Sequence, residues 1–101
     1  MTQSRNYVAR GVAHVTLPPV AEPLAVSFVL LPKFTMLAFS SAIEPLRIAN
    51  QLTGQILFRW QVLSEDGGPV ACSNGVPVMA DGAWGGTQPQ GMVLVCSGVE
   101  P

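Results

Sequence analysis

The stretch "AVSFVLLPKFTMLAFSSAIEPLRIAN" (residues 25–50) passes from one hydrophobic pattern to another within a few residues. Residues 25–32 form a continuous apolar run that ends at a proline, which is typical of a strand buried on both faces. The apolar residues that follow are spaced three, four, three and three positions apart, which places them on one face of a helix. These residues are Met36, Phe39, Ile43, Leu46 and Ala49. A buried strand followed at once by an amphipathic helix indicates an α/β fold.

The predicted helix has suitable residues at both ends and an unusual one inside. Thr35 is a favourable N-cap, and Gly54 is a favourable C-terminal stop. Pro45 has no amide hydrogen to donate, so we expect the helix to bend or restart there. Glu44 would then precede a second short helix that has Pro45 at its first position. Pro45 therefore marks either the edge of a pocket or only a bend in a packed helix.

The later segments complete a predicted parallel sheet. Residues 56–64, "ILFRWQVLS", alternate in polarity and predict a strand. Asn74-Gly75 lies between two short apolar runs and predicts a hairpin whose two turn residues both have positive φ. Residues 83–91 predict a loop or a poorly formed helical turn, and 92–98 a further short, buried strand. Strand, helix and strand in this order favour a right-handed crossover. Such a sheet needs helices on both faces, yet only one helix is convincing, so the chain resembles the first half of a domain.

The composition limits the functions that this segment can have by itself. The chain of 101 residues is 49% hydrophobic and 11% charged, against roughly 25% charged in a typical soluble domain. We therefore expect part of its surface to meet more protein. The net charge is −1 and no basic stripe occurs, which argues against nucleic-acid binding by this segment. The apolar run before Pro32 is about half the roughly 20 residues that a membrane helix requires, so we expect a cytoplasmic protein without a membrane segment.

The division of the chain follows from the same patterns. Residues 1–23 show no sustained period and predict a disordered leader, and residues 24–101 form the folded part. The one histidine, His14, lies in this leader, and Cys72 and Cys96 have no CxxC spacing, so we expect neither a metal site nor another cofactor. The glycine pairs do not form a phosphate-binding motif.

Few residues are candidates for catalysis. Cys96 ends the last predicted strand, but Leu94 and Val95 precede it where a nucleophile elbow requires small residues, so we interpret it as a packed residue. Cys72 lies beside a hairpin turn with no base in its sequence neighbourhood. Glu65 and Asp66 could be a carboxylate pair, although "SEDGG" is ordinary turn chemistry, which we favour.

Two further candidates concern ligand binding. Glu44 and Arg47 are three residues apart and can pair at the surface, or Glu44 can line a pocket at the strand ends. The aromatic residues are mostly expected in the core. Phe34 differs because it lies in the first strand-to-helix loop, at the sheet edge where such folds place ligand contacts.

Three segments together carry a resemblance to a known family. They are "FVLLPKFTMLAFSSAIEPLRIAN", "RWQVLSEDGGPVACSNG" and "VLVCSGVEP". In this order they resemble the N-terminal half of the DJ-1/PfpI-like (class I glutamine amidotransferase-like) domain of AraC-family transcriptional regulators, over residues 25–101. The most similar branch regulates the catabolism of quaternary amines such as glycine betaine and carnitine. The resemblance implies a partial flavodoxin-like sensing domain, a helix-turn-helix DNA-binding domain elsewhere in the protein, and a homodimer.

The resemblance also bears on Pro45. Enzymes of the DJ-1/PfpI superfamily carry an acidic residue four positions before this proline, where it contacts the catalytic cysteine. Here that position is Ser41, which cannot supply the carboxyl group. The resemblance therefore implies a pocket whose catalytic acid is lost and a small-molecule effector in place of a substrate. A quaternary amine would need aromatic faces or a carboxylate around its cation, and the candidates are Phe34, Trp84 and Glu44.

Two alternatives to a sensing domain remain at this point. The chain could belong to a DJ-1/PfpI-type hydrolase or amidase-like enzyme, which would require a cysteine elbow and a histidine beyond Pro101. It could also be a fragment with no activity of its own.

Overall fold

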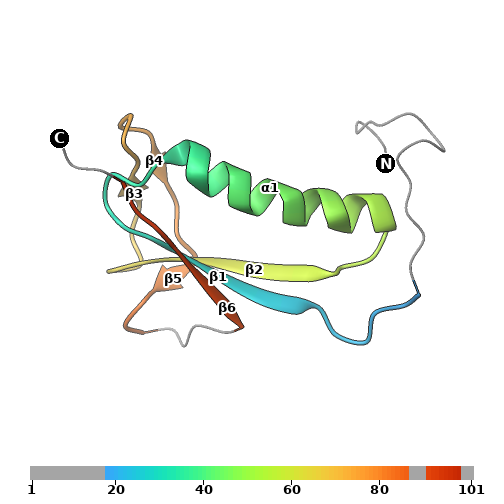
Figure 1. The fold of residues 1–101 in the computed structure, drawn as a ribbon. Helices are drawn as coiled ribbons and strands as arrows, with labels where there is room; N and C mark the ends of the chain where they lie inside the picture. Colours follow the sequence, from blue (N-terminus) through green and yellow to red (C-terminus); the bar gives the residue numbers. More distant parts are fainter. Residues whose placement is uncertain (1–17, 87–90, 99–101) are drawn as a thin grey trace.

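A computed structural model describes residues 18–86 and 91–98 and shows an α/β arrangement with a single four-stranded parallel sheet (Figure 1). The sheet order is β5-β2-β1-β6, and β3 and β4 form a separate antiparallel pair. The elements, in chain order, are β1 (Leu24–Leu30), α1 (Met36–Thr53), β2 (Phe58–Ser64), β3 (Val70–Ala71), β4 (Pro77–Val78), β5 (Gly82–Ala83) and β6 (Met92–Cys96). The predicted strand, helix, strand, hairpin, loop, strand order is confirmed, with the short β5 added where the predicted loop begins.

The strand order confirms the partial flavodoxin-like sheet. β1 lies in the middle, with β2 on one side and β6 on the other, which is the 2-1-3 order of that fold. Val26 of β1 is level with Trp60 of β2 and with Met92 of β6, so these three residues share a sheet face. In this fold the ligand crevice lies where neighbouring crossovers diverge, beyond the carboxyl ends of β1 and β6.

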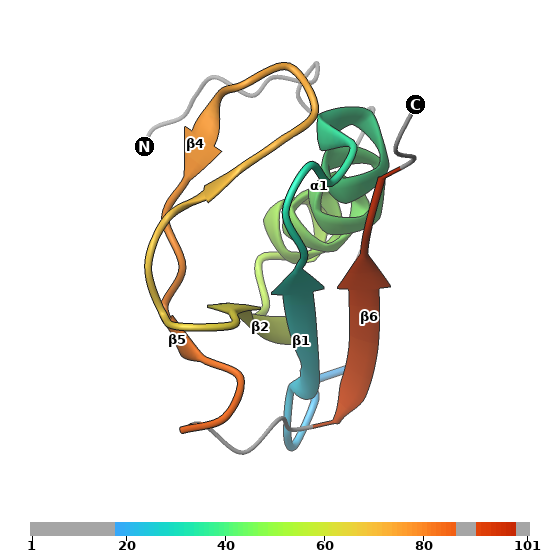
Figure 2. The same ribbon diagram turned by 90° about the vertical axis from the view of Figure 1, so that its left-hand side faces the viewer.

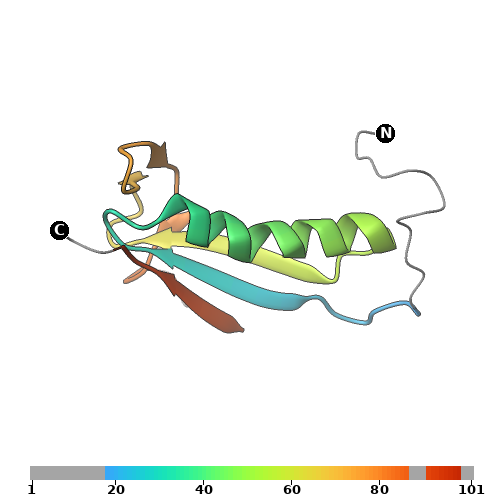
Figure 3. The same ribbon diagram turned by 45° about the horizontal axis from the view of Figure 1, so that its top comes forward.

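α1 covers one face of the sheet (Figures 1 and 3). Its apolar stripe faces the strands as predicted: Phe39 is buried, and its ring meets that of Phe28 edge to face with centroids 5.5 Å apart. The partly buried members of the stripe pack on the same core; they are Met36, Ile43 and Leu46. The face on the other side of the sheet carries no helix among the residues that the structure describes.

The ends of α1 agree with the sequence, but its interior does not. Gly54 adopts the left-handed conformation (φ 69°) and donates its N–H to the Asn50 carbonyl at 3.0 Å. Thr35 occupies the N-cap position, although its hydroxyl makes no capping hydrogen bond. The expected restart at Pro45 is wrong, because α1 continues through it as one helix of 18 residues. Pro45 is exposed, and the packed stripe on the opposite side holds the helix together across the missing hydrogen bond.

The hairpin is confirmed, but its turn differs from the predicted one. Val70 pairs with Val78 and Ala71 with Pro77. Of the two predicted turn residues only Gly75 has positive φ, at 90°. The Cys72 N–H bonds to the Val76 carbonyl and the Gly75 N–H to the Cys72 carbonyl, both at 2.9 Å, which gives a three-residue loop that ends in a left-handed glycine.

The expectation of a buried last strand is wrong. β6 is an edge strand, and Met92, Val93 and Val95 are 59%, 39% and 59% exposed. Only Cys96 at its end is buried. The apolar composition of β6 is typical of a strand that packs against further protein. No described residues pair with its free edge.

The N-terminal segment is described only from residue 18 onward. Residues 18–23 contain neither helix nor strand, and the Val20 N–H donates to Gln55 Oε1 at 2.8 Å. Residues 1–17 of the expected leader, and with them His14, lie outside the described residues.

Candidate functional site at the carboxyl edge of the sheet

Three segments meet beyond the carboxyl ends of β1 and β6: the β1–α1 loop, the end of β6 with the residues after it, and the hairpin (Figure 2). The β1–α1 loop lies between the other two. On one side, its Leu31 N–H bonds to the Cys96 carbonyl at 3.0 Å, and the Thr35 N–H to the Ser97 carbonyl at 3.4 Å. On its other side, the Lys33 N–H bonds to the Ala71 carbonyl of the hairpin at 2.9 Å. The first strand-to-helix loop is thus held by two segments that are remote from it in sequence.

The loop itself is a tight turn with an unusual backbone. The Phe34 N–H bonds to the Leu31 carbonyl at 3.1 Å, and Pro32 and Lys33 occupy the two central positions. Lys33 has φ of 66°, the single positive φ of a non-glycine residue in the described ranges. A left-handed conformation at the third residue of a turn that has proline at the second is the pattern of a type II turn, which favours glycine at that position. The sequence signal for the turn was Pro32, but nothing marked Lys33.

Phe34 lies at the predicted edge, but inside the core. It is fully buried, and its ring meets the Phe39 ring edge to face at a centroid distance of 5.9 Å. Its carbonyl accepts the Ser73 N–H at 2.8 Å. Phe34 therefore lies beneath the β1–α1 loop, and the described residues cover its ring completely, so no ligand can contact it.

The two helix candidates lie on the outer surface of α1. Glu44 accepts hydrogen bonds from Arg47 Nε at 2.8 Å and Nη2 at 2.6 Å, so the surface pair expected from the spacing is present. Ser41, the position of the lost catalytic acid, is also exposed. Neither side chain is buried beneath the described segments at the carboxyl edge.

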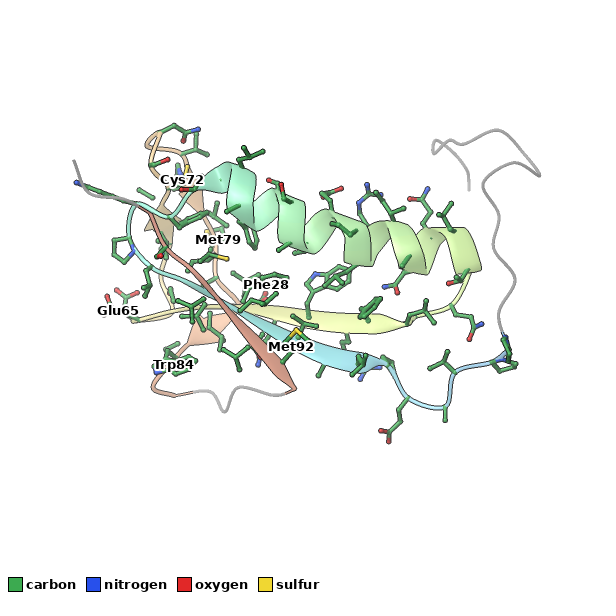
Figure 4. The ribbon with its side chains drawn as sticks, viewed as in Figure 1. Phe28, Glu65, Cys72, Met79, Trp84 and Met92 are labelled. Carbon is green, nitrogen blue, oxygen red and sulfur yellow. The ribbon has the colours of Figure 1, made fainter. Side chains whose placement is uncertain are left out.

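Trp84 follows β5 and lies beyond the sheet from α1 (Figure 4). Its N–H bonds to the Ser64 carbonyl at the end of β2 at 2.6 Å, and its side chain is 45% exposed. The sheet therefore lies between Trp84 and Glu44, and the described residues do not bring the two side chains into one pocket.

Both cysteines are buried structural residues. Burial raises the pKa of the Cys96 thiol above its ordinary value, so the protonated form is favoured, the opposite of what a nucleophile needs. The Cys72 thiol donates to Asn74 Oδ1 at 2.6 Å.

Asp66 Oδ1 accepts the Gly68 N–H at 2.8 Å, which is the turn chemistry that the sequence predicted for this stretch.

A shallow cavity lies elsewhere, on the helix-free face of the sheet. Its volume is about 150 Å³, and its walls come from the first halves of β1 and β2, with Ser27, Arg59 and Gln61 among them. Gln61 Nε2 donates to Ser27 Oγ at 2.9 Å across its floor. The cavity is smaller than the roughly 300–1,000 Å³ of typical ligand sites, and it is remote from the carboxyl edge.

α1 begins at the carboxyl edge, directly after the β1–α1 loop. The first backbone N–H groups of α1 have no acceptor within the helix, as at any helix start, and Thr35 does not cap them. Within the described ranges no group of three or more histidine, cysteine or acidic side chains gathers to hold a metal ion. No helix among these residues is long and apolar enough to cross a bilayer.

Known proteins similar to this chain are transcriptional regulators. The chain is 49% identical over 74 residues to the HTH-type transcriptional regulator CdhR of Pseudomonas aeruginosa, and 42% identical over 82 residues to the HTH-type transcriptional regulator GbdR of the same species. It is 37% identical over 76 residues to the HTH-type transcriptional regulator GlxA of Rhizobium meliloti. The matches cover 73%, 81% and 75% of this chain, and 22%, 22% and 24% of the three regulators. No family model matches the sequence.

The fold has a counterpart of the same kind. A crystal structure of an AraC family transcriptional regulator from Pseudomonas putida superimposes with a TM-score of 0.67 at 31% sequence identity, over 76% of this chain and 48% of that one. Sequence and fold agree on the relationship that the three quoted segments predicted. The chain is therefore a homologue of the AraC-family transcriptional regulators, and it spans part of their length.

Proposed function

We propose that this chain is part of the effector-sensing domain of a transcriptional regulator that binds DNA through a helix-turn-helix domain elsewhere in the protein. The homology carries the proposal, above all the 49% identity to CdhR over 73% of the chain. The partial flavodoxin-like sheet supports it, because such sheets bind small molecules at the edge where the β1–α1 loop lies. On this proposal the protein acts in the cytoplasm as a homodimer.

Sensing without catalysis fits two residues of the chain. Ser41 stands where the related enzymes have an acid, and the buried Cys96 thiol is held protonated. A pocket that keeps its shape and has no reactive group can still shift a conformational equilibrium when it is filled. The hydrolase alternative has no comparable support, since the relatives are regulators.

The effector that we propose is a quaternary amine, such as glycine betaine or carnitine. Its cation would be held by an aromatic face and a carboxylate, for which Trp84 and Glu44 are the exposed candidates. The sheet separates these two residues, so each is tested by itself. Phe34 would not contact the effector. It would hold the β1–α1 loop in place through its buried side chain.

Calorimetry on the full-length protein tests the effector. We expect glycine betaine or carnitine to bind, and 3,3-dimethylbutyrate, which has the same shape as betaine but no cation, not to bind. Trp84→Ala or Glu44→Gln should weaken binding about tenfold, which is about 1.4 kcal/mol. The matched control is Glu65→Gln, another exposed glutamate, which should leave the affinity unchanged. Equal binding of the neutral compound would contradict a cation site.

The regulatory part of the proposal has a separate test. The full-length protein should shift DNA from its own promoter region in a gel assay, and the affinity should fall steeply with salt, as expected for phosphate contacts. Added effector should change the DNA affinity or activate a reporter. A protein that binds the amine but no DNA would contradict the proposed regulatory function, while the proposed effector-binding domain would remain supported.

A further inference from the structure

The hairpin turn contains the one Asn-Gly pair of the chain, Asn74-Gly75. An asparagine followed by glycine loses its side-chain amide group without an enzyme more readily than other asparagines, because glycine has no Cβ to obstruct attack by its backbone nitrogen. Both residues are exposed, and a Cβ at position 75 would meet nothing within 4 Å among the described residues. Water therefore reaches both reacting groups.

The reaction is a cyclisation followed by a hydrolysis. The Gly75 amide gives its proton to hydroxide, and its nitrogen attacks Cγ of Asn74. The Cγ–Nδ2 bond breaks, and Nδ2 takes up a proton from water and leaves as ammonia. Water then opens the succinimide ring at either carbonyl carbon. Opening at the side-chain carbon gives aspartate, and opening at the backbone carbon gives isoaspartate, in which the main chain runs through Cβ and Cγ.

In the folded hairpin, hydrogen bonds hold both reacting groups. The Gly75 N–H donates to the Cys72 carbonyl at 2.9 Å, so loss of its proton would leave a negative nitrogen against a carbonyl oxygen. Asn74 Oδ1 accepts the Val76 N–H at 3.0 Å and the Cys72 thiol at 2.6 Å, which fixes the orientation of the side-chain amide. The buried Cys72 side chain thereby links the exposed turn to the core (Figure 4). The reaction accordingly requires the turn to open.

Little structure keeps the turn closed. β3 and β4 are two residues long, and they pair only at Val70–Val78 and Ala71–Pro77. Val76, within the turn, is 49% exposed. Segments with few buried apolar contacts open locally far more often than the whole domain unfolds. The turn therefore opens without loss of the sheet.

The hairpin also supports the β1–α1 loop at the carboxyl edge. The Ser73 N–H, next to Asn74, donates to the Phe34 carbonyl at 2.8 Å, and the Lys33 N–H donates to the Ala71 carbonyl at 2.9 Å. Isoaspartate lengthens the main chain of the turn by a methylene group, which displaces the turn relative to these contacts. A chemical change at an exposed turn is thus transmitted to the loop of the candidate site.

We propose that Asn74 is a site of spontaneous deamidation, that opening of the hairpin turn sets its rate, and that the isoaspartate product loosens the β1–α1 loop. Water is the co-reactant, and ammonia is the leaving group. The proposal does not depend on the proposed function, because it requires neither effector nor DNA. Its consequence is an ageing process in which the carboxyl edge of old molecules is less ordered than that of newly made ones.

Peptide mass spectrometry of the full-length protein tests the site and the opening step. The protein is incubated in one mildly alkaline buffer, both folded and in guanidinium chloride. Each event adds about 1 Da to the peptide that holds residue 74. We expect Asn74 to react in both states, and at least about tenfold faster in the unfolded chain.

Asn50 is the matched control in the same digest. Gln51 follows it, so a side chain obstructs the attack, and its Oδ1 is held by the Leu57 and Phe58 N–H groups. Asn50 should stay unmodified in the folded protein and react more slowly than Asn74 in guanidinium chloride. Equal rates at the two asparagines in the unfolded chain overturn the site, and equal rates at Asn74 in both states overturn the opening step.

Substitutions of Cys72 test the hydrogen bonds that hold the turn. Cys72→Ala removes the thiol donor and should raise the rate in the folded protein about threefold or more, the effect of one lost hydrogen bond on an opening equilibrium. Cys72→Ser keeps a donor and should raise it less. Both variants should match the wild type in guanidinium chloride, where no turn exists. A folded Cys72→Ala protein that reacts at the wild-type rate overturns the control of opening by this contact.

Hydrogen exchange measures the effect on the β1–α1 loop. The deamidated fraction carries an extra negative charge and is separated by ion exchange. In its isoaspartate share, the Lys33 and Ser73 amides should exchange at least about tenfold faster than in unmodified protein. Asn74→Asp is the matched control, because it carries the same charge on an unaltered main chain, and its exchange should stay close to that of the wild type. Unchanged exchange in the isoaspartate form, or equally fast exchange in Asn74→Asp, overturns the loosening by the longer main chain.

Discussion

At the scale of single residues, close backbone contacts hold the carboxyl edge together. Gly98 follows β6 and lies against the Lys33 carbonyl, where a Cβ atom at position 98 would overlap the carbonyl oxygen. Lys33 in turn adopts a left-handed conformation that costs a residue with a side chain roughly 1–2 kcal/mol. Two unusual residues in contact at the predicted ligand edge indicate that the shape of this loop is maintained against a local cost.

Gly98→Ala should therefore destabilise the protein by about 1–3 kcal/mol, because the added methyl group must displace backbone rather than a flexible side chain. Chemical denaturation measures the change. Gly85→Ala is the matched control: its Cβ would meet nothing within 4 Å, so we expect a change within about 0.5 kcal/mol. Equal effects of the two substitutions would show that the loop shifts freely.

The buried thiol of Cys96 predicts a loss of stability in alkaline solution. Its pKa in the folded protein is raised above the ordinary value of 9.0, so the unfolded chain releases the thiol proton first as the pH rises. The contribution of Cys96 to the free energy of unfolding is therefore constant below about pH 9 and falls above it. Urea unfolding between pH 7 and pH 11 should show a steeper decline for the wild type than for Cys96→Ser. Parallel profiles would mean that the thiol ionises freely in the folded state.

At the scale of elements, regular periods were readable from the sequence, and local exceptions were not. The helical spacing from Met36 to Ala49 and the left-handed stop at Gly54 both predicted α1 correctly, because each depends on neighbours along the chain. The restart expected at Pro45 does not occur, since packing on the sheet outweighs one missing hydrogen bond. Asn50 is a second feature that the sequence pattern did not predict. Its Oδ1 accepts the Leu57 and Phe58 N–H groups at 2.8 and 3.0 Å, and these hydrogen bonds cross the turn between α1 and β2.

The proposed site was readable only in part, for the same reason. The strand-to-helix loop was found from the end of the apolar run at Pro32, which is a local signal. The burial of Phe34 and the separation of Trp84 from Glu44 depend on how β5 and the hairpin pack, which is long-range information. Their roles as ligand contacts stay predictions.

Pro45 also makes a prediction about α1 as an element. A proline inside a helix costs about 3 kcal/mol relative to alanine, partly offset by the roughly 0.4–1 kcal/mol that proline contributes by restricting the unfolded chain. Pro45→Ala should thus stabilise the protein by about 2 kcal/mol and return a donor to the Ser41 carbonyl. Pro45→Gly restores the same donor with a poorer helix former, so it should gain about 1 kcal/mol less. Denaturation midpoints that are unchanged in both variants would mean that the helix is already distorted at this turn.

At the scale of the whole molecule, α1 covers one face of the sheet, and no described helix covers the other, where Val29 and Leu63 are nevertheless buried. α1 protects the side of Phe28 and Leu30, while Val93 and Val95 are exposed on β6. Related sheets have helices on both faces, and this chain spans 48% of the solved regulator that it superimposes on. We infer that the helix-free face is an internal surface of a larger domain, which also explains why so few charges are needed to cover the chain.

That inference predicts how the 101-residue chain behaves by itself. The exposed apolar residues of β6, Val93 and Val95, should bind a hydrophobic dye such as ANS, and thermal unfolding should be broad, because a small core gives a low enthalpy. Replacing both Val93 and Val95 by lysine should at least halve the dye fluorescence. Ile56→Lys, at a residue that is 61% exposed outside the sheet, should change it little. A sharp transition without dye binding would mean instead that the helix-free face is already covered in the isolated chain, by self-association or by residues outside the described ranges.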